Sequence, residues 1–187
     1  MKKFLAVLLC GAMLASFAVG CGKKDNNEQN PSGENQVIDE TTFDKVIESV
    51  KGEYGDDYLP NTEMDEERFV EVTGINMENV ERFYAEEPMI GMQVDKFIAI
   101  KAKEGKGADV EADLNAYRDV LVNDSLQYPI NEAKVESSEV VRYGDYVYFV
   151  MLGKFDERDD VDDESALEFA KKETKRGLDK IASFFNM

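Results

Sequence analysis

The feature that most constrains the fold is an uninterrupted apolar run in the last third of the chain. Residues 146–152 read YVYFVML, so a strand here is hydrophobic on both faces. Such a strand needs cover on each side. We therefore expect that it is either central in a sheet covered on both faces or presents one face to a partner. Gly144-Asp145 is a favoured two-residue turn and predicts a hairpin between 134–142 and 145–152.

The remaining patterns mix helices with strands. Helical spacing of apolar residues predicts helices over 42–51, 65–72, 108–127 and 164–185, with a helical turn at 76–82. Alternation of apolar and polar residues predicts a strand over 92–102, and residues 82–87 are a candidate edge strand beside it. We expect an α+β fold: an antiparallel sheet of about four strands with the two long helices packed on one face, preceded by short helices.

The start of the chain resembles an export signal. Two lysines precede the apolar run Phe4 to Phe17, which is too short and too closely followed by polar residues for a comfortable membrane span. Ala18-Val19-Gly20-Cys21 then resembles the bacterial lipobox, although Ala18 replaces the commoner Leu. The resemblance implies cleavage before Cys21 and lipidation of Cys21. The alternative is an ordinary secretory cut that leaves Cys21 as a free thiol.

These signals divide the chain into three parts. We predict a lipoprotein signal peptide over 1–20, a lipid-anchored flexible tether over 21–37, and a single α+β domain over 38–187. Residues 22–35 contain no apolar side chain and are rich in Asn, Gly, Pro and Ser, which is typical of a flexible tether. The expected location is the outer face of the cytoplasmic membrane, with the lipid on Cys21 as the contact to the membrane.

Composition excludes several classes of function. The chain has no His, and its two Cys lie within the first 21 residues. Imidazole-based catalytic triads, thiolate nucleophiles in the folded part and the common zinc sites are therefore excluded. The chain has 40 Asp and Glu against 22 Lys and Arg, a net charge of −18. This balance argues against nucleic acid as a partner, because phosphate would be repelled. We expect no catalytic residue, no cofactor and no metal.

Two polar segments are candidate ligand sites. Asn123, Asp124, Gln127 and Tyr128 lie where the long helix stops before a proline, and could form a small ledge for a ligand. The alternative is a helix C-terminus whose last carbonyls need partners.

The second candidate is the loop GEYGDDYLPN, in which Asp57 and Tyr58 combine carboxylate and aromatic groups. The alternative here is a turn with Tyr58 packed on the sheet.

Two other patterns are read structurally. The acidic segment 156–164 fails the calcium-loop spacing, because Val161 and Leu167 occupy the sixth and twelfth positions counted from Asp156. It is interpreted as a solvated loop whose last residues cap the terminal helix. Gly105-Lys106-Gly107 lacks the remaining elements of a phosphate loop and is interpreted as a plain strand-to-helix turn.

Between Tyr54 and Gly153 the chain resembles a known family. The segments that carry the resemblance are GDDYLP at 55–60, VDKFIAIKA at 94–102, YRD at 117–119, NDSLQYP at 123–129 and GDYVYFVMLG at 144–153. They are similar to the domain of unknown function 4358, an uncharacterised lipoprotein family of anaerobic Gram-positive bacteria. The family implies a lipoprotein signal, a tether and one domain. It has no assigned activity, so no catalytic residue can be transferred.

Three functions follow as hypotheses. The first is a non-enzymatic, lipid-anchored binding or protein-interaction domain, with a homodimer or a membrane or wall protein as partner. The second is a lipoprotein that binds a small ligand (a sugar, peptide or cation) through Tyr58 and Tyr128. The third is a carboxylate-based hydrolase of wall glycans, although no spacing singles out two carboxylates.

Overall fold

The computed structural model describes residues 40–158 and 160–185, all within one compact unit of the chain. The predicted signal peptide, Cys21 and the predicted tether lie outside the described residues. The elements in chain order are α1 (Glu40–Tyr54), η1 (Gly55–Asp57), β1 (Thr62–Glu63), α2 (Glu66–Thr73), η2 (Met77–Asn79), β2 (Val80–Glu87), β3 (Lys96–Ala102), α3 (Gly107–Asn123), α4 (Pro129–Glu136), β4 (Glu139–Tyr143), β5 (Tyr146–Met151) and α5 (Asp163–Ala182).

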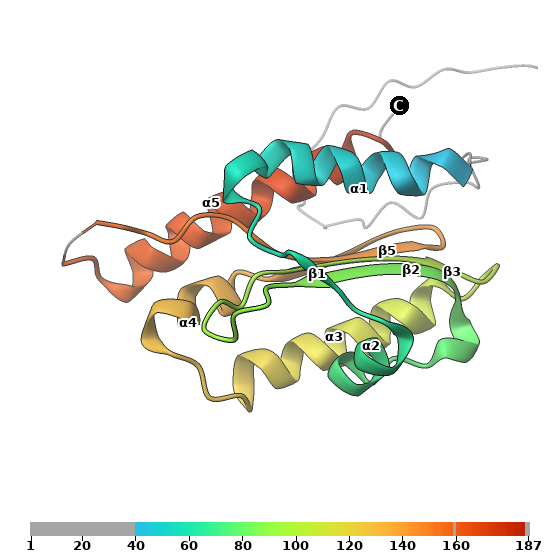
Figure 1. Ribbon diagram of the computed structural model, residues 1–187, viewed down its shortest axis with the longest axis horizontal. Helices are drawn as coiled ribbons and strands as arrows, with labels where there is room; N and C mark the ends of the chain where they lie inside the picture. The colour runs from blue at the N-terminus through green and yellow to red at the C-terminus, as the bar shows by residue number, and fades with distance from the viewer. Residues whose placement is uncertain (1–39, 159, 186–187) are drawn as a thin grey trace, which may run out of the picture. The chain divides into compact units, whose positions relative to one another are not determined.

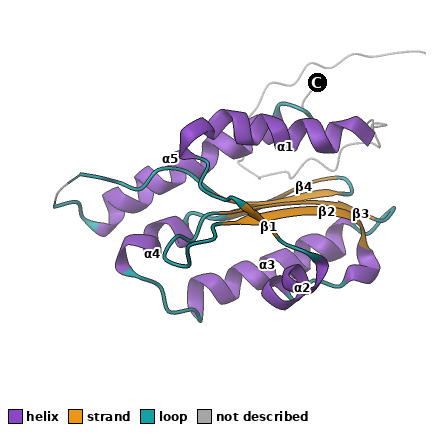
Figure 2. Cartoon of the chain, in the orientation of Figure 1, coloured by secondary structure: helices purple, strands orange, loops and turns teal. Residues whose placement is uncertain are grey.

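The described residues form a five-stranded antiparallel sheet between two helical layers (Figure 1). The strand order is β1-β2-β3-β5-β4, and every neighbouring pair is antiparallel. Helices α1 and α5 cover one face, and α2, α3 and α4 cover the other (Figure 2). The predicted α+β class with an antiparallel sheet is confirmed, with five strands where about four were expected.

The prediction that both long helices pack on one face is wrong, because α3 and α5 lie on opposite faces. The reason is the apolar run in β5, whose residues are all buried. Val147, Phe149 and Met151 pack under α3, while Tyr148 and Val150 pack on the α1 and α5 side. Both faces are therefore covered by the chain's own helices. Of the two readings of this strand, the structure shows the one that needs no partner.

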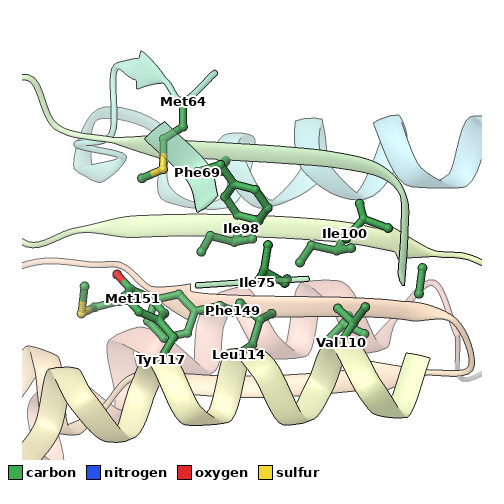
Figure 3. Close-up of a cluster of buried hydrophobic side chains, with 14 of the residues drawn as sticks. Met64, Phe69, Ile75, Ile98, Ile100, Val110, Leu114, Tyr117, Phe149 and Met151 are labelled. Carbon is green, nitrogen blue, oxygen red and sulfur yellow. The ribbon is translucent and has the colours of Figure 1, made fainter. Parts of the chain in front are cut away.

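The core between the sheet and α3 is drawn in Figure 3. Helix α3 presents Val110, Leu114 and Tyr117 to the sheet, at the helical spacing seen in the sequence. The Tyr117 ring lies 5.5 Å from that of Phe149. Burying a large apolar side chain such as Leu114 contributes about 1.5–3 kcal/mol. This layer therefore fixes α3, and with it the loop that follows.

The opposite layer is built from the first and last helices. Helix α1 buries Phe43, and α5 buries Ile181 against the same face of the sheet. The two helices are joined by Tyr54, whose hydroxyl donates to the Glu173 carbonyl at 2.8 Å and accepts from the Gly177 amide at 3.0 Å. A Cβ on Gly177 would lie 2.8 Å from the Tyr54 hydroxyl. Glycine at 177 therefore permits the close approach of the two helices.

Three expected elements have different bounds or a different type. Residues 129–136 form helix α4, so the predicted strand over 134–142 shrinks to β4. Pro129 takes the first position of that helix, where its missing N–H costs nothing. The strand expected over 92–102 begins only at Lys96. The candidate edge strand over 82–87 is β2, which lies inside the sheet between β1 and β3.

The two ends of the sheet carry different parts of the chain. The described chain enters at Glu40, and α5 ends at Ala182, both toward the right in Figure 1. The loops between β2 and β3, between α3 and α4, and between β5 and α5 lie toward the left (Figure 1).

Among the described helices, none combines the length and apolarity that crossing a bilayer requires.

Candidate functional site

Two uncharged loops meet at the left end of the sheet in Figure 1. Residues 88–94 read PMIGMQV and residues 125–131 read SLQYPIN, and neither contains a charged side chain. Charged residues make up 33% of the whole chain. These two segments therefore differ sharply in composition from the surface around them.

The two loops expose most of their large apolar side chains. Of the eight strongly exposed large hydrophobic residues in the described part of the chain, six lie on these loops or on the first turn of α4. They are Met89 (78% exposed), Ile90 (62%), Met92 (65%), Leu126 (103%), Tyr128 (58%) and Ile130 (67%). We call these six side chains the loop surface. Isolated exposed apolar residues are ordinary, but a concentrated set marks an interaction site.

Hydrogen bonds hold the two loops in place. The Gln93 amide donates to the Ile90 carbonyl at 3.1 Å and closes a tight turn. The Met89 amide donates to Asn61 Oδ1 at 2.9 Å. The buried Asn131 of α4 donates through Nδ2 to the Met92 carbonyl at 3.0 Å and joins one loop to the other. The exposed side chains are thus carried on fixed backbone.

A buried ion pair fastens α4 behind the loop surface. Lys134 Nζ lies 2.9 Å from both carboxylate oxygens of Asp95 and donates to the Gly153 carbonyl at 2.6 Å. The Phe155 ring lies 3.7 Å from the same Nζ. Lys134 and Asp95 are both almost inaccessible to solvent. The pair ties α4 to the start of β3 and to the end of β5.

The charges of this pair are perturbed by their burial. Burial raises the pKa of the Asp95 carboxyl, and the neighbouring ammonium opposes that shift. Burial lowers the pKa of the Lys134 amine, and the Asp95 carboxylate opposes that shift. Each ion depends on the other, because an isolated buried charge is strongly unfavourable. Lys134 and Asp95 therefore act as one structural unit.

A hollow of about 320 Å³ opens between the two loops. Its polar wall is a row of ion pairs: Glu87 lies 3.0 Å from Arg68 Nε and 3.3 Å from Lys96 Nζ. Lys96 also donates to the Tyr117 hydroxyl at 2.9 Å. Gln93 and Gln127 add uncharged polar groups to the lining. The charged groups of the wall are thus engaged in ion pairs with one another, and the two glutamine side chains are uncharged polar groups beside them.

The first candidate ledge partly coincides with this hollow. Gln127 lines it, and Tyr128 lies on the loop surface beside it. Asn123 donates to the Asp119 carbonyl within the last turn of α3, and Asp124 is exposed after that turn. Gln127 Nε2 donates to Ser125 Oγ at 2.6 Å. The ledge as a ligand site stays a prediction.

The second candidate lies on the other face of the sheet. The Tyr58 hydroxyl donates to Glu86 Oε2 at 2.7 Å, and Lys51 Nζ lies 3.1 Å from the same carboxylate. Burial raises the pKa of Tyr58, and the neighbouring Glu86 carboxylate raises it further. Asp57 is paired with Lys154 at 3.4 Å. Adjacent residues of a strand point to opposite faces of the sheet. Glu86, which binds Tyr58, and Glu87, which lines the hollow with Gln127, therefore lie on opposite faces. Tyr58 and Gln127 do not share a site. A ligand role for Asp57 and Tyr58 also stays a prediction.

The two patterns interpreted structurally are explained by contacts within the chain. The amides of Gly105 and Gly107 each donate to the Asp145 carboxylate at 3.0 Å, where a phosphate loop would hold an anion. Asp162 caps α5 by accepting from the Ser165 amide at 2.8 Å, as expected of the acidic loop. Within the described ranges, no group of three acidic side chains is placed to hold a metal ion.

The residues that fix the loop surface are not among the candidates predicted from the sequence. Asp95 falls inside the strand predicted over 92–102, Lys134 falls at the start of the strand predicted over 134–142, and Asn131 falls outside the predicted elements. The available signal was Pro129, which favours the first position of a helix and would place Asn131 and Lys134 on one helix face. No signal connected Lys134 to Asp95, because their pairing depends on tertiary structure.

Comparison with known proteins gives a family and no function. Neither a curated protein nor a solved structure matches the chain. One family model, the domain of unknown function DUF4358, matches residues 53–152. That range spans β1 to β5, with the hollow and the six residues of the loop surface inside it. Because the match covers more than half of the chain, the chain belongs to the DUF4358 family.

Proposed function

We propose that this protein is a lipid-anchored, extracytoplasmic lipoprotein whose folded part is a non-enzymatic protein-interaction domain. The anchor rests on the sequence around Cys21. The interaction rests on one structural observation, the gathering of six exposed apolar side chains on two fixed, uncharged loops. The sheet itself supplies no docking face, because its own helices cover both sides.

The chemistry of the loop surface suits a protein partner. Interface centres are depleted in charge and enriched in Met and aromatic residues, and two methionines and a tyrosine are present here. Methionine adapts its shape to irregular partners. Because hydrogen bonds already fix the loops, little conformational entropy is lost on binding.

The position of the loop surface supports the same proposal. The described chain enters at Glu40, at the opposite end of the sheet from the two loops (Figure 1). The loops therefore lie at the far end of the described domain from the residue at which the preceding chain joins it. The domain would thus present the loop surface to a membrane or wall protein.

The hollow supports a second candidate function. Its ion-paired wall and the amides of Gln93 and Gln127 could hold an uncharged polar ligand, such as a sugar. A thermal-shift screen with sugars, short peptides and cations tests this candidate. An increase in melting temperature that is lost in Gln127→Ala would support it, and no shift with any ligand would contradict it.

The interaction is tested by site-specific photocrosslinking in cells that carry the full-length protein. A photoreactive phenylalanine analogue replaces Met92 in one variant and Leu126 in another. The matched control carries it at Glu48, which is exposed on α1 in the other layer. We expect the same adduct from both loop positions and none from the control. Adducts that are identical at all three positions, or absent from both loops, would contradict the proposal.

The anchor is tested separately by metabolic labelling with a clickable fatty acid. We expect label in the membrane fraction of the wild-type protein and none in Cys21→Ser. Equal labelling of the two proteins, or recovery of the wild-type protein mainly from the cytosol, would contradict the lipoprotein assignment.

A further inference from the structure

We infer that the loop surface receives a protein segment with an apolar centre flanked by Lys or Arg side chains. The inference rests on the proposed function, because it specifies the partner of the same surface. It starts from the contrast between the uncharged loops and the charges that surround them.

The surroundings of the loop surface are acidic. Helix α4 and the end of α3 expose carboxylates beside the loops, and the segment between β5 and α5 exposes more at the same end of the sheet (Figure 1). Phe155 joins that segment to α4 by its contact with Lys134. At this end of the sheet, the exposed carboxylates that form no ion pair with another described residue include Asp124, Glu132, Glu136, Glu157, Asp160, Asp162, Asp163 and Glu164.

The neighbouring cations do not neutralise these carboxylates. Arg68 and Lys96 are paired with Glu87, and Lys134 is buried on Asp95. Arg118 donates to the backbone carbonyls of Ser138 and Glu136 and keeps its positive charge, but it is one cation beside a larger number of exposed carboxylates. In the segment before α5, the two cations pair with Asp57 and Asp156. The excess charge at this end is therefore negative, in a chain of net charge −18.

This pattern selects one kind of occupant. A second copy of the chain would place acidic residues against acidic residues, and like charges that meet across an interface are unfavourable. An anionic lipid surface would be repelled for the same reason. A segment with an apolar centre fills the loop surface, while its Lys or Arg flanks face Asp124 and Glu132. Opposite charges around an apolar centre also accelerate association at low salt.

The charge requirement is tested with two synthetic peptides that share an apolar centre and differ only in their flanks. One carries two lysines on each side and the other carries two glutamates. Each is labelled and titrated by fluorescence anisotropy with the full-length protein in phosphatidylcholine nanodiscs. We expect the lysine-flanked peptide to bind at least tenfold tighter at about 50 mM salt, with affinity falling as salt rises.

Variants locate the site and separate the two proposals. Met92→Ser/Leu126→Ser removes the apolar centre, and Asp124→Asn/Glu132→Gln removes two neighbouring charges. Glu48→Gln/Glu78→Gln removes two exposed charges elsewhere and is the control. We expect the apolar pair to weaken lysine-peptide binding at least tenfold, the neighbouring pair about threefold to tenfold, and the control less than twofold.

The outcomes distinguish failure of the charge inference from failure of the proposed function. If the peptides bind equally and only the apolar pair matters, the charge inference fails and the interaction domain stands. If the control weakens binding as much as the neighbouring pair, attraction is global and the inference also fails. If neither peptide depends on Met92 and Leu126, the loop surface is not the site and both proposals fail. Concentration-dependent self-association that Met92→Ser/Leu126→Ser abolishes would assign the surface to a second copy and overturn the inference.

Discussion

Replacing Lys134 with Met should destabilise the fold severely. Methionine keeps most of the side-chain length, so no large cavity forms and the change isolates the charge. It removes the three hydrogen bonds of Nζ and leaves the Asp95 carboxylate buried without a cation. Breaking a buried pair in this way costs about 3–5 kcal/mol. The expected loss is a large fraction of the roughly 5–15 kcal/mol that holds such a domain folded.

Urea unfolding followed by circular dichroism measures this effect. With a slope of about 2 kcal/mol per molar, the midpoint should fall by about 2 M. The matched variant Asp95→Asn/Lys134→Met removes both charges. It should recover at least half of the loss, because no buried charge is left alone.

The pH dependence of Lys134→Met gives a second test. Burial raises the pKa of Asp95, and removing the ammonium takes away the interaction that opposes this shift. The folded variant then binds a proton more readily than the unfolded chain, so its stability should rise as the pH falls from 8 toward 5. A midpoint change below about 0.5 M would refute the reasoning, as would a double variant no more stable than the single one.

Three further predictions concern the turn, the loops and the tyrosines. Gly107→Ala should lower the free energy of unfolding by about 1–3 kcal/mol, since its Cβ would lie 2.2 Å from the Gly144 carbonyl oxygen. Gly91→Ala is the control, because a Cβ at that position meets no atom within 4 Å. Thermal unfolding compares the two variants. Met92→Ser should change the free energy of unfolding by less than about 0.5 kcal/mol while it reduces crosslinking, and a large loss of stability would show a structural role. Burial raises the pKa of Tyr54 and Tyr148 above 10.0, so stability should hold below pH 10 and fall above it; ultraviolet titration in which all tyrosines ionise near 10 without unfolding would contradict this.

The class of fold could be predicted because local patterns determine it. The turn at Gly144-Asp145 and the period of Val110, Leu114 and Tyr117 lie within short stretches of sequence. The same β5 run implied two covered faces, but the pattern does not say which helix covers which face. That choice depends on how α1 and α5 pair, and they pair through Tyr54 and Gly177, more than a hundred residues apart.

The candidate site was only partly predictable. Gln127 and Tyr128 were identified from the change of pattern before Pro129, and they lie at the hollow and on the loop surface. The end of the other loop falls inside the strand predicted over 92–102, because Met92 and Val94 alternate with polar residues. Alternation alone does not distinguish a strand from an apolar loop that leads into one. Exposure of Met89 and Met92 follows from the tertiary structure, so the sequence could not reveal it.

The pairing of the first and last helices has a consequence for how the protein is made. A ribosome releases the N-terminus first, so α1 and the whole sheet are complete before α5 emerges. Until then, Tyr148 and Val150 have only half of their cover, and Tyr54 lacks the Gly177 amide. The nascent chain therefore carries an open hydrophobic face from the completion of β5 until α5 has emerged. Premature termination before about residue 170 would leave that face permanently open and make the truncated product a target for chaperones and proteases.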